Sequence, residues 1–139
     1  SMHTIATIHT PFHIDLQWWA SHGRNLGRFL AEIVGAEDDS RATNTAVDFI
    51  HPRTAEVRQI DPLWARVLTE RAYQPDYITP STPLTNALLR ALVENVNEPM
   101  TAVEMHRRLN RSNPETLLRV LKTARTEYGI VPAENVARQ

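Results

Sequence analysis

The chain has 139 residues, of which 42% are hydrophobic and 22% charged, and its formal net charge is −1. These values are ordinary for a globular domain, and no apolar run approaches the roughly 18 residues that a membrane-spanning helix needs. Because the sequence contains no cysteine, disulfides, thiolate metal sites, iron–sulfur ligation and cysteine nucleophiles are excluded, which is compatible with the cytoplasm as the expected location.

The first predicted element is a helix over residues 16–34, for which Asp15 can serve as the N-cap. Apolar side chains recur along it near helical spacing. Gly23 weakens its middle, since glycine costs about 1 kcal/mol relative to alanine inside a helix, and Gly35 can end it. The segment that follows, residues 35–45, is poor in apolar groups and rich in turn formers, so we expect an exposed loop.

Residues 46–60 predict a β-hairpin with a proline in its turn. A three-residue loop, residues 52–54, would place Phe49 opposite Val57, whereas a two-residue loop would place it opposite Glu56. Because the first register pairs like faces across the strands, it is the favoured prediction.

Three later helices begin with a capping residue followed by proline at the first helical position, where its missing amide would have no partner. A fourth begins with a capping box, Thr101 with Glu104 three residues on. The predicted helices cover residues 62–73, 83–96, 102–109 and 114–125, and a strand candidate follows at 128–131.

The last three predicted helices have the order of a helix-turn-helix unit, in which a short helix and a tight turn precede an outward-facing long helix. The stretch TPLTNALLRALVENVNEPMTAVEMHRRL resembles the start of winged-helix modules of the helicase and RNA-polymerase-delta-associated type, and the resemblance covers residues 82–131. A winged helix normally adds a C-terminal hairpin, but this sequence offers one strand there. The wing is therefore expected to be either truncated or borrowed, and the upstream hairpin or the TIATIHT segment could supply the missing strand.

Taken whole, the chain is also similar to a group of uncharacterised bacterial proteins. The similarity runs through WWASHGRN, FIHPRTAEV, IDPLW and NVNEPMTAVEM. It implies no activity and leaves the function open.

Charge is unevenly distributed along the chain. Residues 1–80 carry seven Lys/Arg and ten Asp/Glu, whereas residues 81–139 carry eight and six. Residues 107–125 hold six cations and one anion, an excess that can anchor phosphates, with polar groups at the helix N-terminus as further donors. The candidate nucleic-acid contacts are Arg107, Arg108, Arg111, Ser112, Asn113, Arg119, Lys122 and Arg125.

The same basic helix has two other interpretations, a solvated face and a protein-binding surface, because the chain as a whole is not basic. In each case one side of the helix is expected to be apolar and buried. The residues expected to face the core are Leu117, Leu118, Leu121 and Ala124, and those expected to point away are Glu115, Arg119, Lys122 and Thr126.

Trp18 and Trp19 would point about 100° apart on a helix, so one can be buried while the other stays partly exposed. Together with Phe29 they are candidates for a core or for a partner surface, including self-association. His9 and His13 lack the spacing of zinc ligands, and the sequence has no phosphate-binding loop and no GxSxG motif. We therefore expect no catalytic residue, no metal and no cofactor, although a small hydrolase whose carboxylates and histidines converge in space stays open.

The expected fold is α+β and mainly helical, with an N-terminal helix and β-hairpin in residues 1–80 packed as one fold with a degenerate winged-helix or helix-turn-helix module in residues 81–139. The expected function is a non-enzymatic binding module, DNA-binding or transcription-associated, with double-stranded DNA as partner. The alternative is a protein-interaction adapter on the same scaffold. No membrane partner is expected.

Overall fold

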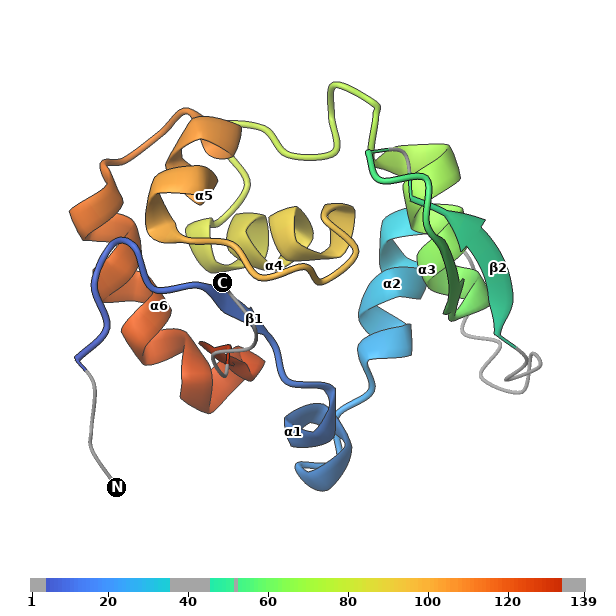
Figure 1. The fold of residues 1–139 in the computed structure, drawn as a ribbon, viewed down its shortest axis with the longest axis horizontal. Helices are drawn as coiled ribbons and strands as arrows, with labels where there is room; N and C mark the ends of the chain where they lie inside the picture. The colour runs from blue at the N-terminus through green and yellow to red at the C-terminus, as the bar shows by residue number, and fades with distance from the viewer. Residues whose placement is uncertain (1–4, 36–45, 52, 134–139) are drawn as a thin grey trace.

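The computed structural model describes residues 5–35, 46–51 and 53–133, so the predicted loop at 36–45 and Pro52 lie outside the described residues. The fold is α+β, about half helical, with two small antiparallel sheets of two strands each (Figure 1). In chain order the elements are β1 (Phe12–Ile14), α1 (Leu16–Ser21), α2 (Leu26–Val34), β2 (Val47–Ile50), β3 (Val57–Ile60), α3 (Pro62–Arg66), the π-helical turn η1 (Val67–Arg71), α4 (Leu84–Glu94), α5 (Ala102–Leu109), α6 (Pro114–Tyr128) and β4 (Ile130–Pro132). None of the helices in the described ranges is long and apolar enough to span a bilayer.

The prediction of a single N-terminal helix is wrong, because two helices, α1 and α2, occupy that segment. Asp15 caps α1 as predicted, and Gly23 follows the helix end with a left-handed φ of 65° that glycine tolerates without steric cost. Asn25 then starts α2, its side-chain oxygen accepting the Gly27 N–H at 2.8 Å. The glycine that was expected to weaken one helix instead separates two.

The β2–β3 hairpin forms, but the predicted register is wrong by one residue. Phe49 lies opposite Arg58, and Ile50 lies opposite Val57. The His51 N–H donates to the Glu56 carbonyl at 2.8 Å, so the connection is one residue longer than expected. As a result, the β-branched pair Ile50 and Val57 shares the outer face of the hairpin, where both side chains are exposed.

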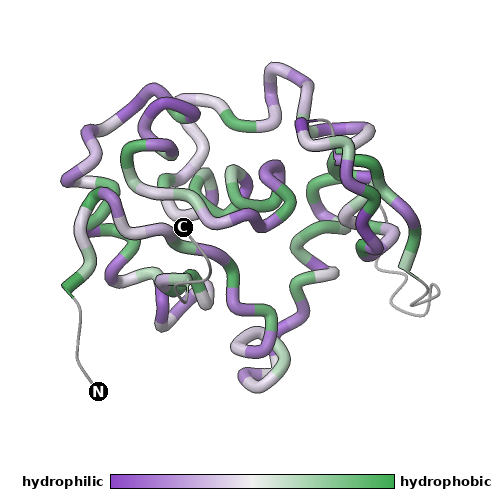
Figure 2. Tube along the Cα trace, viewed as in Figure 1, coloured by the Kyte–Doolittle hydropathy of each residue, from purple (hydrophilic) through white to green (hydrophobic). Residues whose placement is uncertain are grey.

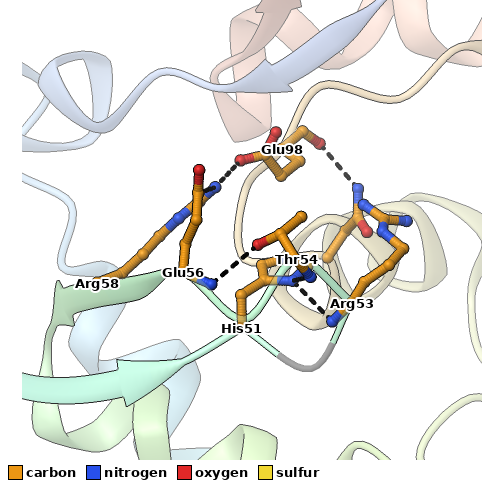
Figure 3. A network of polar contacts seen from close by, with 7 residues as sticks. His51, Arg53, Thr54, Glu56, Arg58 and Glu98 are labelled. Carbon is orange, nitrogen blue, oxygen red and sulfur yellow. Dashed lines mark hydrogen bonds and ion pairs between the residues drawn. The ribbon is translucent and has the colours of Figure 1, made fainter.

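His51 explains the longer loop, because its imidazole binds the turn backbone (Figure 3). The Nδ1 atom accepts the N–H groups of Arg53 at 3.1 Å and Thr54 at 3.3 Å. The chain then turns through Ala55, which has a φ of 63° and donates its N–H to the His51 carbonyl at 2.8 Å. The register prediction considered only which strand faces pair, so it did not include the hydrogen bonds of the His51 side chain to the turn.

One hydrophobic core extends through both halves of the chain, with α4 at its centre (Figure 1), and Figure 2 shows hydrophobic residues along that helix. Leu88, Leu89 and Leu92 of α4 are fully buried. From the N-terminal half, Trp64 on α3 enters the same core and donates its indole N–H to the Val93 carbonyl at 2.9 Å. The hairpin-bearing half is thus packed directly on the central helix.

The strand beside β4 is β1, which follows the TIATIHT segment, whereas the β2–β3 hairpin forms its own sheet. Phe12 lies opposite Pro132 and also bridges to Met100, exchanging backbone hydrogen bonds of 2.8 and 2.9 Å with it. The Asn97 side chain binds both backbone groups of Ile14, at 2.8 and 3.0 Å. The N-terminal strand is therefore part of the sheet that flanks the C-terminal helices.

Helix boundaries agree best where capping signals are strong. Helix α5 covers the predicted residues 102–109, and α4 lies within 83–96. Helix α6 continues to Tyr128, three residues beyond the prediction, so that β4 begins at Ile130 instead of residue 128. The predicted helix over 62–73 divides into α3 and the π-helical turn η1.

Because Tyr77 is buried in its protonated form, we expect the protein to lose stability in alkaline solution. Its side chain is fully buried and its hydroxyl donates to the Arg90 carbonyl at 2.7 Å, and burial raises the pKa of the phenol well above its ordinary value of 10.0. Above pH 10 the unfolded chain loses this proton while the folded chain keeps it, so stability falls as pH rises. We expect Tyr77→Phe to flatten this decline, measured by urea unfolding below and above pH 10. An unchanged decline in the variant would assign it to other groups.

Candidate nucleic-acid interface

Capping residues place α5 and α6 as the sequence predicts. In the capping box before α5, the Thr101 hydroxyl accepts the Glu104 N–H at 3.1 Å, and the Glu104 carboxylate accepts the Thr101 N–H at 2.9 Å. Asn113 caps α6, its side-chain oxygen accepting the Thr116 N–H at 2.8 Å. Both helices therefore start at residues fixed by local chemistry.

The turn between these helices contains two non-glycine residues in left-handed conformations, Asn110 with a φ of 56° and Ser112 with a φ of 60°. The side chain of His106 on α5 holds this turn through a 2.7 Å contact between its Nδ1 and the Ser112 carbonyl, so this nitrogen carries the donated proton. The role of His106 was not predicted from the sequence, because a histidine six residues before its backbone partner matches no known capping or turn motif. It sets the direction in which the chain enters α6.

The predicted division of α6 into two faces is confirmed. Its apolar side packs into the core and its polar side is exposed. The buried residues are Leu117, Leu118, Leu121 and Ala124, and the exposed ones include Glu115, Arg119, Lys122 and Thr126.

Four of the six candidate cations remain available at the surface. Arg107 on α5 and Arg119, Lys122 and Arg125 on α6 are exposed, and within the described ranges no carboxylate lies at ion-pair distance from any of them. Since the α6 cations lie three residues apart, they form a stripe that winds along the outer side of the helix. We call these four residues the α5–α6 cation stripe.

The other two candidate cations hold the fold together. Arg108 forms an ion pair with Glu94 on α4, with 2.7 Å between Nε and Oε1. Arg111 donates through Nη1 to the carbonyls of Thr82 at 2.7 Å and Thr79 at 3.3 Å. Both residues are half-buried. Two of the six cations predicted to contact phosphates are therefore bound to partners within the protein.

Ser112 and Asn113 lie exposed at the start of α6, as expected for donors beside a phosphate. The side-chain oxygen of Asn113 is used by the cap and the backbone carbonyl of Ser112 by His106. The side-chain NH₂ group of Asn113 and the hydroxyl of Ser112 are therefore the donors that these residues can offer to a phosphate.

The three aromatic candidates do not form one exposed surface. Trp19 is 5% exposed and donates its indole N–H to the Tyr128 carbonyl at 2.9 Å, so it belongs to the core. Trp18 is half-buried, stacked on His22 with ring centroids 4.2 Å apart. Phe29 is half-buried as well. A partner surface using all three would require Trp19 to leave the core.

Among the described residues, no group of three or more histidine, aspartate or glutamate side chains is placed to hold a metal ion. Comparison with known proteins adds no relative, since no family model, no curated protein and no solved structure matches the chain. The chemistry of the surface is therefore the basis for a functional proposal.

Proposed function

We propose that the protein is a non-enzymatic module that binds duplex DNA through the α5–α6 cation stripe, with α6 as the contacting helix. The observation that carries this proposal is the set of four exposed cations, without carboxylate partners in the described part of the chain, on the outward side of two capped helices. Cations placed in this way can neutralise phosphates, while the polar start of α6 offers further donors.

The arrangement of strands supports the proposal that residues 81–139 form a winged-helix-like module. β1 lies beside β4, where the second strand of a C-terminal hairpin would lie, and Phe12 also bridges to Met100 just before α5. In this proposal the N-terminus supplies the strand that the C-terminal sequence lacks. The hairpin β2–β3 has no part in the proposed DNA contact.

The test is a fluorescence-anisotropy titration of labelled duplex DNA at two salt concentrations. We expect affinity to fall steeply with salt, since each neutralised phosphate adds about −0.9 to the slope of log affinity against log salt. Replacing Arg119 and Lys122 together with alanine is expected to reduce the magnitude of that slope by about 1.8. Alanine preserves the helix because it has the highest helix propensity.

The control for net charge is the double variant Arg53→Ala/Arg66→Ala, which removes two exposed cations from the hairpin turn and α3, of which Arg66 is paired with Glu70 at 2.9 Å. It changes the net charge of the protein by the same amount but leaves α6 intact, so the slope should stay near the wild-type value. Equal losses in both double variants would indicate a general charge effect. Absence of binding by the wild-type protein at low salt would overturn the proposal.

A further inference from the structure

A pocket of about 320 Å³ lies where the β2–β3 hairpin and η1 meet α4 and α5. This volume is at the lower end of the range for small-molecule sites. Most of its wall is apolar, formed by Phe49, Leu68, Ala72, Val96 and Met100. The pocket is separate from the cation stripe and joins the two halves of the chain.

His51 gives this pocket an unused hydrogen-bond donor. Its Nδ1 accepts two backbone N–H groups of the turn, so the ring proton must sit on Nε2. The side chain lines the pocket and is 4% exposed, and Nε2 has no hydrogen-bond partner among the described residues. A buried donor without an acceptor costs free energy, and a ligand that supplies the acceptor recovers that cost.

The polar groups around the pocket favour a negatively charged acceptor. Arg53 and Arg108 both contribute to the lining, and the exposed Tyr73 stands at the same wall. Glu94 is the carboxylate in the described lining, and Arg108 already neutralises it at 2.7 Å. The remaining positive charge is that of Arg53, on the turn that His51 organises (Figure 3).

The π-helical turn η1 gives a second, independent indication. It supplies Leu68 to the pocket wall, and Ala72 follows immediately after it. Because π-helical turns are rare and appear frequently at functional sites, their occurrence beside a donor-lined pocket is informative. A regular α-helix through this segment would direct these side chains differently.

We propose that this pocket binds a small monocarboxylate with an apolar body. Because Nε2 is itself buried in the pocket wall, a small movement of the ring or wall lets the carboxylate accept the Nε2–H of His51 near the Arg53 guanidinium, while the apolar body packs against Phe49, Leu68 and Met100. This site is independent of DNA binding, and either property can exist without the other.

The experiment titrates the full chain, labelled with ¹⁵N and with ¹³C methyl groups, with benzoate, phenylacetate and isovalerate in turn. Each carboxylate is compared with its neutral counterpart, benzyl alcohol, phenylethanol or isoamyl alcohol. We expect at least one carboxylate to shift the His51 ring nitrogens and the methyl signals of Leu68 and Met100 saturably. The matched alcohol should bind at least ten-fold more weakly, because it lacks the charged acceptor.

Two variants separate binding from folding. His51→Asn keeps a side-chain acceptor for the turn amides, as in an Asx turn, but has no group at the position of Nε2. It should stay folded and lose carboxylate affinity by about ten-fold or more. Ala72→Leu leaves His51 in place and reduces the space in the pocket, so it should weaken the carboxylate as well.

Three outcomes would overturn the proposal. Equal shifts of the same signals by carboxylates and alcohols would show that the pocket is an apolar hollow without anion recognition. Absence of saturable shifts with all three carboxylates, up to the solubility limit of each, would show that the pocket takes no such ligand. Undiminished affinity in folded His51→Asn would assign recognition to other groups.

Discussion

Replacement of Trp64 by alanine is expected to lower the free energy of unfolding by about 3–5 kcal/mol, the usual range for removing a large aromatic from a core. Trp64 is 7% exposed and packs α3 against the central helix. Its loss also leaves the buried Val93 carbonyl without the indole N–H. Urea unfolding followed by circular dichroism measures the difference.

Trp64→Phe is the matched control, since it keeps most of the ring and removes the N–H donor. We expect it to cost about 1–2 kcal/mol, the net contribution of one hydrogen bond plus a small packing loss, because the Val93 carbonyl keeps the Val96 N–H at 3.0 Å. The alanine variant should destabilise both halves in one transition, because they share a single core. Separate transitions for the N-terminal and C-terminal signals would contradict this expectation.

Replacement of Gly129 by alanine is the second large effect, with an expected loss of about 3 kcal/mol from a left-handed backbone and an overpacked contact. Gly129 ends α6 with a φ of 60°, and an added Cβ would lie 2.7 Å from Cε3 of Trp18. The ring of Trp18 is rigid and stacked on His22, so it cannot yield as a flexible side chain would.

Gly23→Ala supplies the control for the backbone alone. Gly23 has a similar φ of 65°, but no atom lies within 4 Å of the added Cβ. Its substitution should cost about 1 kcal/mol, and the difference between the two variants measures the contact with Trp18. Thermal unfolding of both proteins provides the comparison, and equal losses would show that Trp18 moves away without cost.

The sequence predicts best where a local signal decides the structure. The capping box at Thr101 and the proline after Asn113 place the starts of α5 and α6 correctly, because both act within one helical turn. The leucine spacing of α6 likewise predicts its buried side. In each case the residues that determine the element are neighbours in the sequence.

The predictions failed where the structure is determined by a contact that is distant in the sequence or of an unusual kind. The hairpin register depends on the His51 ring binding turn amides, an arrangement that strand patterning does not contain. The roles of Arg108 and Arg111 depend on α4 and on the loop before it, so helix position alone made them appear available. The pocket beside η1 is lined by segments that are far apart in the sequence, and no sequence pattern indicates that they lie together.

The pairing of β1 with β4 bears on the order in which the molecule can assemble. Among the described elements, β1 is synthesised first and β4 last, yet Phe12 and Pro132 are partners. Closing so long a loop is entropically unfavourable until the intervening helices have brought its ends together. During translation β1 can bridge to Met100 before β4 has been made, whereas its pairing with β4 can form only after the last described strand has been synthesised.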